Sequence, residues 1–255
     1  MPGETIVALV AVYVALEEIA LRKFIRRTWG RKVKVGSKMR LVFVVGKSEN
    51  NLEMSGIQEE NNSHHDIIQA NFIDTYRNLT LKSLALFRWT DRYCRNAKHI
   101  LKIDSDMKID LSKLMTVLQT TKIPDRFICG YLLVNHSVVR HLDSKWYVPF
   151  DTYPNEHFPN YCQGAAYITT HRIGRRIARV SVPPNPFPID DAYITGILRE
   201  SLGEGIERRI ISFKHHYNQT ETKVMKGDFM KYIMTVYVDG SGDKEIKGTA
   251  SLKNN

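Results

Sequence analysis

Short apolar runs alternate with segments of helical periodicity over the first 110 residues, and this alternation constrains the fold more than any other feature. The apolar runs predict buried strands over 6–16, 40–45, 66–72 and 99–103. The segments between them predict helices over 21–29, 50–65 and 78–93, the second of them together with a loop. Strands that alternate with helices form parallel sheets in which the helices are crossovers. The sequence therefore predicts an α/β fold with a mostly parallel central sheet flanked by helices.

The character of the sequence changes after residue 110. Further strands are expected over 127–135, 146–148 and 232–238, and a helix over 189–198. Segments rich in proline predict irregular structure over 153–161 and 181–188, and the polar end of the chain predicts a mobile tail over 239–255. At 255 residues the chain can bury the core of one large domain. We expect a single domain over 1–255, with one lobe over about 1–110 and another over about 111–238.

Two carboxylates follow directly on the strand predicted over 99–103. Asp104 and Asp106 are separated only by Ser105. Ligands of open α/β sheets bind outside the carboxyl ends of the strands. Two acids there offer hard oxygen ligands for Mn²⁺ or Mg²⁺, and such a cation could hold a diphosphate. The alternative is a surface turn, in which Asp and Ser are also common.

The charge balance favours an anionic partner. There are 37 Lys and Arg against 27 Asp and Glu, a formal net charge of +10. Nucleotide diphosphates, acidic glycans, membrane surfaces and nucleic acids all fit this excess. No basic helix is interleaved with aromatic residues, which argues against nucleic acid.

The cysteines and the glycosylation sequons bear on the compartment. The three cysteines lack the spacing of a zinc site and allow at most one internal disulfide; they are Cys94, Cys129 and Cys162. Sequons that favour a secretory compartment occur at Asn61, Asn78, Asn135 and Asn218. The apolar run over 6–16 is too short to span a bilayer and lacks the flanks of a signal peptide. Either the chain is cytosolic or an N-terminal anchor lies outside this sequence.

Eight motifs in order resemble the β-1,3-galactosyltransferase family, which also includes β-1,3-N-acetylglucosaminyltransferases and Fringe-related enzymes. The resemblance covers about residues 5–200. The motifs are Arg22-x-x-Ile25-Arg26-x-Thr28-Trp29, the run 42–46 ending in Gly46, the segment 66–82 with Asp74, Tyr76, Asn78 and Lys82, Trp89 with Cys94, Lys102-Ile103-Asp104-Ser105-Asp106, Lys145-Trp146-Tyr147, Tyr161-Cys162-x-Gly164-x-x-Tyr167, and Asp190-Asp191-x-x-x-x-Gly196.

This resemblance implies a GT-A-like nucleotide-diphospho-sugar transferase fold and an inverting, metal-dependent transfer of a hexose. The donor is a UDP-sugar, with UDP-galactose favoured over UDP-GlcNAc by the overall likeness. The acceptor is a glycan on a glycoprotein or glycolipid, and the cofactor is Mn²⁺ or Mg²⁺. The lobe over 1–110 is then expected to bind the nucleotide sugar and the lobe over 111–238 the acceptor. Family members are usually type II membrane proteins of the Golgi lumen.

The resemblance also implies roles for the acids. Asp104, Ser105 and Asp106 occupy the metal and ribose motif, with Asp106 as the most direct metal ligand. The family usually has three acids in this motif, so Ser105 affects the expected ribose contact. Asp191 matches the second acid of a Glu-Asp pair and is the candidate catalytic base, while Asp190 replaces the Glu and orients either the acceptor or Asp191. The alternative is that the two acids only cap a helix.

Other matching positions have two open readings each. Arg26 and Lys82 contact uracil or phosphate, or they lie on a solvated charged face. Asp74 holds the nucleotide or caps the following helix. Trp146 and Tyr147 line the acceptor site or pack in the core.

The small residue Gly164 lets backbone approach a ligand closely, since it has no side chain. One departure from the family lies in the strand over 232–238, where Tyr237 stands in place of a metal-binding His; His215 and His216 are alternatives. A catalytically inactive glycan-binding relative is therefore a second reading. A phosphatase of the haloacid-dehalogenase type is disfavoured, because Lys108 stands where that class has Thr or Val.

Overall fold

A six-stranded mixed sheet forms the centre of the molecule, in the order β3-β2-β1-β4-β7-β6. The computed structural model describes residues 5–33, 37–121, 123–126, 128–180 and 185–203, and strands 211–217 and 232–238 by their backbone. The strands of this sheet are β1 (Ile6–Tyr13), β2 (Met39–Lys47), β3 (Ile67–Ile73), β4 (Ala97–Asp104), β6 (Ile128–Leu133) and β7 (Tyr161–Thr170). The first four pair in parallel, whereas β7 runs antiparallel to both β4 and β6. A smaller sheet has the order β5-β9-β8 and consists of β5 (Met107–Ile109), β8 (Ile211–Tyr217) and β9 (Tyr232–Val238).

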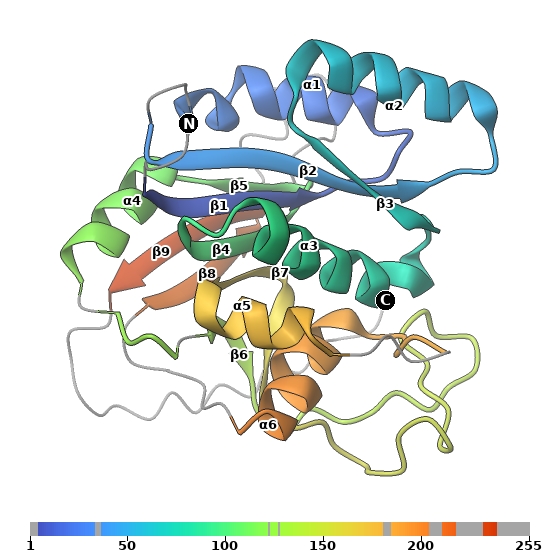
Figure 1. Ribbon diagram of the computed structural model, residues 1–255. Helices are drawn as coiled ribbons and strands as arrows, with labels where there is room; N and C mark the ends of the chain where they lie inside the picture. Colours follow the sequence, from blue (N-terminus) through green and yellow to red (C-terminus); the bar gives the residue numbers. More distant parts are fainter. Residues whose placement is uncertain are drawn as a thin grey trace.

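Helices cover both faces of the central sheet (Figure 1). One face packs against α1 (Ile19–Arg27), α2 (Asn51–His64) and α4 (Leu111–Thr120). The other packs against α3 (Leu79–Tyr93), α5 (His171–Ala178) and the π-helix η3 (Ala192–Leu198), which continues into α6 (Arg199–Ser201). Short 3₁₀ turns follow α1 and precede α3, namely η1 (Trp29–Lys32) and η2 (Tyr76–Asn78). The predicted α/β fold class, with a mostly parallel sheet flanked by helices, is confirmed.

The central strand β1 shows why the apolar runs predicted strands well. All its residues are buried. Val10 and Val12 point into one core, and Leu9 and Ala11 into the other. A strand covered on both faces reads as a continuous apolar run rather than an alternating one.

Buried cations end β1 earlier than the apolar run suggested. The predicted strand over 6–16 stops at Tyr13. Lys82 Nζ donates to the carbonyl of Val14 at 3.0 Å, and the Arg22 guanidinium donates to the carbonyls of Ala15 at 2.8 Å and Leu16 at 3.1 Å. Three successive carbonyls therefore bind side chains instead of a neighbouring strand.

The second half of the chain departs further from the predictions. The strand expected over 146–148 is wrong: Tyr147 N donates to Ser144 O at 3.0 Å in a turn, and only Val148 of that segment is buried. The strand β7 and the helices α4 and α5 were not predicted. Asp190 and Asp191 do open the helical segment expected over 189–198, which becomes π-helical from Ala192.

The strand predicted over 232–238 is present as β9. Several other predictions are not tested by the structure. The tail over 239–255, the sequon at Asn218 and residues 181–184 lie outside the described residues. The division into two lobes near residue 110 stays a prediction. Cys94 and Cys162 are free, buried thiols, and no helix in the described ranges has the length and apolarity to cross a membrane.

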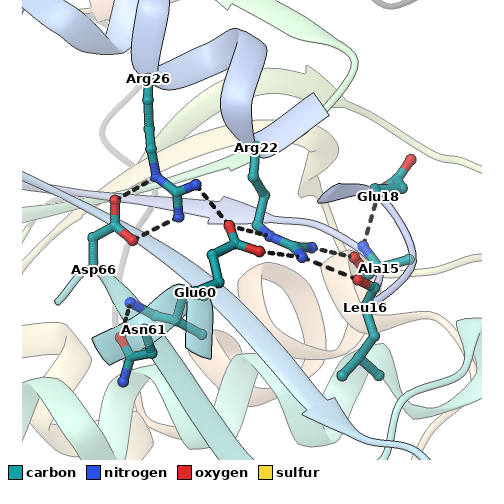
Figure 2. A network of polar contacts seen from close by, with 9 residues as sticks. Ala15, Leu16, Glu18, Arg22, Arg26, Glu60, Asn61 and Asp66 are labelled. Carbon is teal, nitrogen blue, oxygen red and sulfur yellow. Dashed lines mark hydrogen bonds and ion pairs between the residues drawn. The ribbon is translucent and has the colours of Figure 1, made fainter. Parts of the chain in front are cut away.

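A network of two arginines and two acids ties α1 to α2 and β3 (Figure 2). Arg22 is fully buried and donates to both Glu60 oxygens, at 2.9 and 2.8 Å. Arg26 donates to both oxygens of Asp66, each at 2.8 Å, and to Glu60 Oε1 at 2.6 Å. Glu60 therefore serves both guanidinium groups, and their hydrogen bonds hold the pKa of its carboxyl below the usual value despite burial.

Glu60→Ala should lower the free energy of unfolding by about 3 kcal/mol at neutral pH, because it leaves the Arg22 guanidinium buried without its acid. Since the pKa of Glu60 is depressed in the folded state, its contribution is present above the unfolded value of 4.5 and is lost as pH falls through the folded pKa. The difference from wild type should therefore shrink in acid. Denaturant unfolding at several pH values measures it, with Glu59→Ala on the exposed side of α2 as control. Equal effects of the two variants would contradict the assignment.

Candidate active site

A buried lysine lies where the carboxyl end of β4 meets β7. The side chain of Lys102 is 3% exposed. Its Nζ donates to Asp104 Oδ1 at 2.5 Å and to the carbonyl oxygen of Gly164, and it lies 4.7 Å from the ring centroid of Tyr13. Tyr13 is paired with Asp104 in the parallel register of β1 and β4. One ammonium group thus joins the ends of three strands.

Asp191 reaches the same place from the start of the π-helix. Its Oδ2 accepts a hydrogen bond from Gly164 N at 2.6 Å, and its Oδ1 accepts one from Ala192 N at 2.8 Å. A Cβ atom built at Gly164 would lie 3.0 Å from Asp191 Oδ2. A side chain at this position would have to displace Asp191 by a few tenths of an ångström, so the glycine favours the close approach of Asp191. The predicted approach of Gly164 to a ligand stays a prediction.

The acid cluster, which we define as Asp104, Asp190 and Asp191, surrounds Lys102 electrostatically. All three carboxylates favour the charged ammonium, so the pKa of Lys102 is raised even though burial opposes it. Burial and then the neighbouring Asp190 raise the pKa of Asp191 to about 7. Burial raises the pKa of Asp104 to about 6, with Lys102 acting in the opposite direction. A carboxylate whose pKa is raised toward neutrality is suited to general-base chemistry.

The remaining residues of the predicted metal motif follow Asp104. Ser105 N donates to Tyr13 O at 3.0 Å, and its hydroxyl donates to Glu18 Oε2 at 3.3 Å. Asp106 is half-buried, and its charge contributes to the raised pKa of Asp104. Two carboxylates that repel each other suit a divalent cation, which relieves the repulsion.

The donor set near Asp106 is small. Among the described residues, no group of three or more His, Cys, Asp or Glu is placed to hold a metal ion. Mg²⁺ and Mn²⁺ sites that share their cation with substrate phosphates often have only one or two protein carboxylates. Asp104 and Asp106 therefore fit such a cation chemically, and the metal stays a prediction.

The backbone register limits where a late metal ligand can come from. β9 runs parallel to β5, with Tyr232 opposite Met107, the residue after Asp106. Tyr237 is five positions further on, which is about 16 Å along a strand. His215 and His216 lie on β8, which pairs with β9 and is separated from β5 by it. The side chains of these three residues are outside the described part of the chain.

Asp74 and Lys82 form a second buried ion pair at the same edge of the sheet. Lys82 Nζ lies 2.8 Å from Asp74 Oδ1, and the two side chains are 3% and 6% exposed. Asp74 Oδ2 accepts from Gly46 N at 2.8 Å. Burial lowers the pKa of Lys82. The pair fastens the ends of β1, β2 and β3, so the reading of Lys82 as a solvated charge is wrong, as is the reading of Asp74 as a helix cap.

Arg26 also lies away from solvent. Its side chain is 13% exposed and its guanidinium donates to Asp66 and Glu60 in the network of Figure 2. It is thus placed with α2 and β3 rather than with the acid cluster. Its predicted contact with the nucleotide stays a prediction.

Exposed aromatic side chains border the acid cluster. Trp146 is 48% exposed, and Lys145 Nζ lies 4.6 Å from the centroid of its ring and 5.7 Å from that of Tyr76. Burial raises the pKa of Tyr76, and all three acids of the cluster add to the rise. Arg77 donates to the carbonyl of Tyr147 at 3.1 Å, which fixes this loop to η2. Core packing of Trp146 is excluded by its exposure.

Sequence reasoning missed residues around this site. Lys102 stood within a family motif but received no role. Tyr13 and Ser83, whose hydroxyl donates to Asp190 Oδ2 at 3.1 Å, were not singled out. A charged residue inside the apolar run over 99–103 was the one available signal for Lys102. The others depend on which strands and helices become neighbours.

Comparison with known proteins identifies the family of the chain. The galactosyltransferase family model matches residues 20–209. β-1,3-Galactosyltransferase 2 is 36% identical in Mus musculus and 35% identical in Homo sapiens, each over 182 residues that make up 69% of this chain and 43% of the relative. β-1,3-Galactosyltransferase 1 of Mus musculus is 34% identical over 190 residues, 73% of this chain and 58% of the relative. The match thus spans about half the length of these relatives. On this evidence the chain belongs to the galactosyltransferase family.

Proposed function

We propose that the protein is an inverting, metal-dependent β-1,3-galactosyltransferase that transfers galactose from UDP-galactose to a glycan on a glycoprotein or glycolipid. The observation that carries the proposal is the placement of Asp104 and Asp191 around one buried lysine, at the carboxyl end of the parallel strands β1 and β4. Membership of the galactosyltransferase family supports the class of reaction. The same membership supports a type II protein of the Golgi lumen, anchored by a segment outside this sequence.

Asp191 is the proposed catalytic base. Two backbone N–H groups, from Gly164 and Ala192, hold its carboxylate in a fixed orientation. Each carboxylate oxygen has a second lone pair, so the group can still accept a proton from an acceptor hydroxyl. Inverting transfer needs such a base on the side of the anomeric carbon opposite the leaving diphosphate.

Asp106 and Asp104 are the proposed ligands of Mn²⁺ or Mg²⁺. Asp104 Oδ1 already accepts from Lys102, so its Oδ2 and the Asp106 carboxylate are the oxygen donors on offer. When bound, the cation neutralises the diphosphate that departs with UDP. Ser105 lies between these ligands and faces the ribose in this proposal.

The surrounding residues shape the two substrate sites. Asp74 and Lys82 brace the strand ends beneath the nucleotide, and Arg26 fixes the helix beside it. On the acceptor side, the exposed ring of Trp146 offers an apolar face to sugar C–H groups, with Tyr147 next to it. Also on the acceptor side, Gly164 has no side chain and so leaves room for the Asp191 carboxylate.

Asp106→Ala should abolish the metal-assisted part of UDP affinity. Calorimetric titration of UDP, with Mn²⁺ and then with a chelator, measures this directly. Wild type should bind UDP more weakly when the chelator is present, whereas the variant should bind equally weakly in both conditions. If wild-type affinity does not respond to the chelator, the metal assignment is wrong.

Asp191→Asn should reduce turnover by roughly 10²–10⁴, because it removes the proton acceptor while keeping the shape of the side chain. UDP affinity should stay near the wild-type value. The exposed Asp143 provides the control variant Asp143→Asn. Transfer assays with a panel of UDP-sugars would also decide between galactose and N-acetylglucosamine, and near-normal turnover of Asp191→Asn would exclude it as the base.

The pH dependence of kcat/KM should show a rising limb near pH 7. Asp191 must be ionised to accept a proton, and its pKa in the free protein is raised to about 7. Below that pH, activity should fall about tenfold per unit. Steady-state rates between pH 5 and 9 test this, and a limb near pH 4 would mean that a group with an ordinary carboxyl pKa is the base.

A further inference from the structure

A chain of buried hydroxyl groups links the core to the acid cluster. Tyr13 OH donates to Ser83 Oγ at 3.0 Å, and Ser83 Oγ donates to Asp190 Oδ2 at 3.1 Å. The three residues are 4%, 0% and 7% exposed. They come from β1, from α3 and from the segment that opens the π-helix, so tertiary structure alone brings them together.

The direction of this chain is fixed by chemistry. The Ser83 hydroxyl has one hydrogen to donate, and it donates it to Asp190 Oδ2. Its oxygen is then free to accept from Tyr13. A buried carboxylate without such a donor would be costly, which means that Asp190 depends on Ser83 for its place in the core.

A second hydrogen bond fastens the same segment to the same helix. Thr80 Oγ1 donates to the carbonyl of Phe187 at 2.6 Å. Thr80 and Ser83 lie three residues apart and so share one face of α3. Two hydrogen bonds from this face of α3, donated by Thr80 and Ser83, thus hold the segment 187–190, which immediately precedes Asp191.

Anchoring Asp190 determines where Asp191 points. Successive residues of a helical segment are rotated by about 100° from each other. With Asp190 turned toward Ser83, Asp191 is directed to Gly164. Tyr13 is the first residue of this hydrogen-bond chain, and its aromatic ring also lies beneath the Lys102 ammonium.

We propose that Tyr13 and Ser83 are positioning residues, which hold Asp190 through this hydrogen-bond chain and thereby orient Asp191 for proton removal. The inference rests on the proposed function, since it takes Asp191 as the catalytic base. Asp190 itself takes no part in the chemistry. It predicts effects on turnover rather than on donor binding.

Ser83→Ala tests the middle of the chain, and Thr90→Val is its matched control. Thr90 is also fully buried on α3, seven residues further on, but its hydroxyl donates only within the helix, to Leu86 O at 2.8 Å. Ser83→Ala should lower kcat about tenfold or more, the worth of a hydrogen bond to a charged group. The KM for the donor and the UDP affinity should not change, and Thr90→Val should keep kcat within about twofold of wild type.

Two further variants separate positioning from a general loss of structure. Tyr13→Phe keeps the ring beneath Lys102 and removes the hydroxyl that donates to Ser83, so it should lower kcat less than Ser83→Ala does. It also carries the test if Ser83→Ala does not fold. In an Asp190→Asn background, Ser83→Ala should have little additional effect on kcat, because both changes act on one chain.

The possible outcomes are distinct. If the wild-type protein transfers no sugar from any UDP-sugar, the proposed function fails and the inference fails with it. If wild type is active and Ser83→Ala matches Thr90→Val in kcat, only the inference is overturned. A fall in UDP affinity, or full additivity with Asp190→Asn, would overturn it as well.

Discussion

The buried ammonium of Lys102 is the interaction on which the arrangement of the site depends. Removing such a charge from water costs several kcal/mol unless it is well paired. Here the compensation comes from Asp104, from the Gly164 carbonyl and from the face of Tyr13. Because these groups belong to β4, β7 and β1, the three strand ends share one partner. The hydrogen bond from Gly164 to Asp191 then extends this shared support to the π-helix.

Buried cations are used repeatedly at this edge of the sheet. Lys82 and Arg22 bind the three carbonyls that follow β1, as Lys102 binds that of Gly164. Each of these cations also has an acid partner, which limits the cost of burial. Some of the basic residues therefore support loops from inside the protein. Because each of them is paired with an acid, the net charge of +10 is carried by the other residues.

The sequence predicted those parts of the structure that depend on local pattern. Strands such as β1 are apolar throughout because helices cover both their faces, and the Asp104 to Asp106 motif stands directly at the end of one of them. β7 was missed because its small residues are explained by contacts with residues far away in the sequence. Gly164 makes room for Asp191, and Ala166 lies beside Gly130. The burial of Arg26 could not be predicted from local pattern either, because its partners Glu60 and Asp66 lie on α2 and just before β3.

The loop that carries Trp146 also provides an optical probe. An indole that is half exposed and has an ammonium 4.6 Å from its ring emits differently when a ligand displaces the surrounding water. Trp29, at 6% exposure, is instead enclosed in the core between α1 and the sheet. The third tryptophan, Trp89, is half-buried on α3, and Trp89→Phe would remove it. Quenching of this variant by an added solute would then distinguish Trp146 from Trp29. Occupancy of the site and integrity of the fold can thus be followed separately in one unlabelled sample.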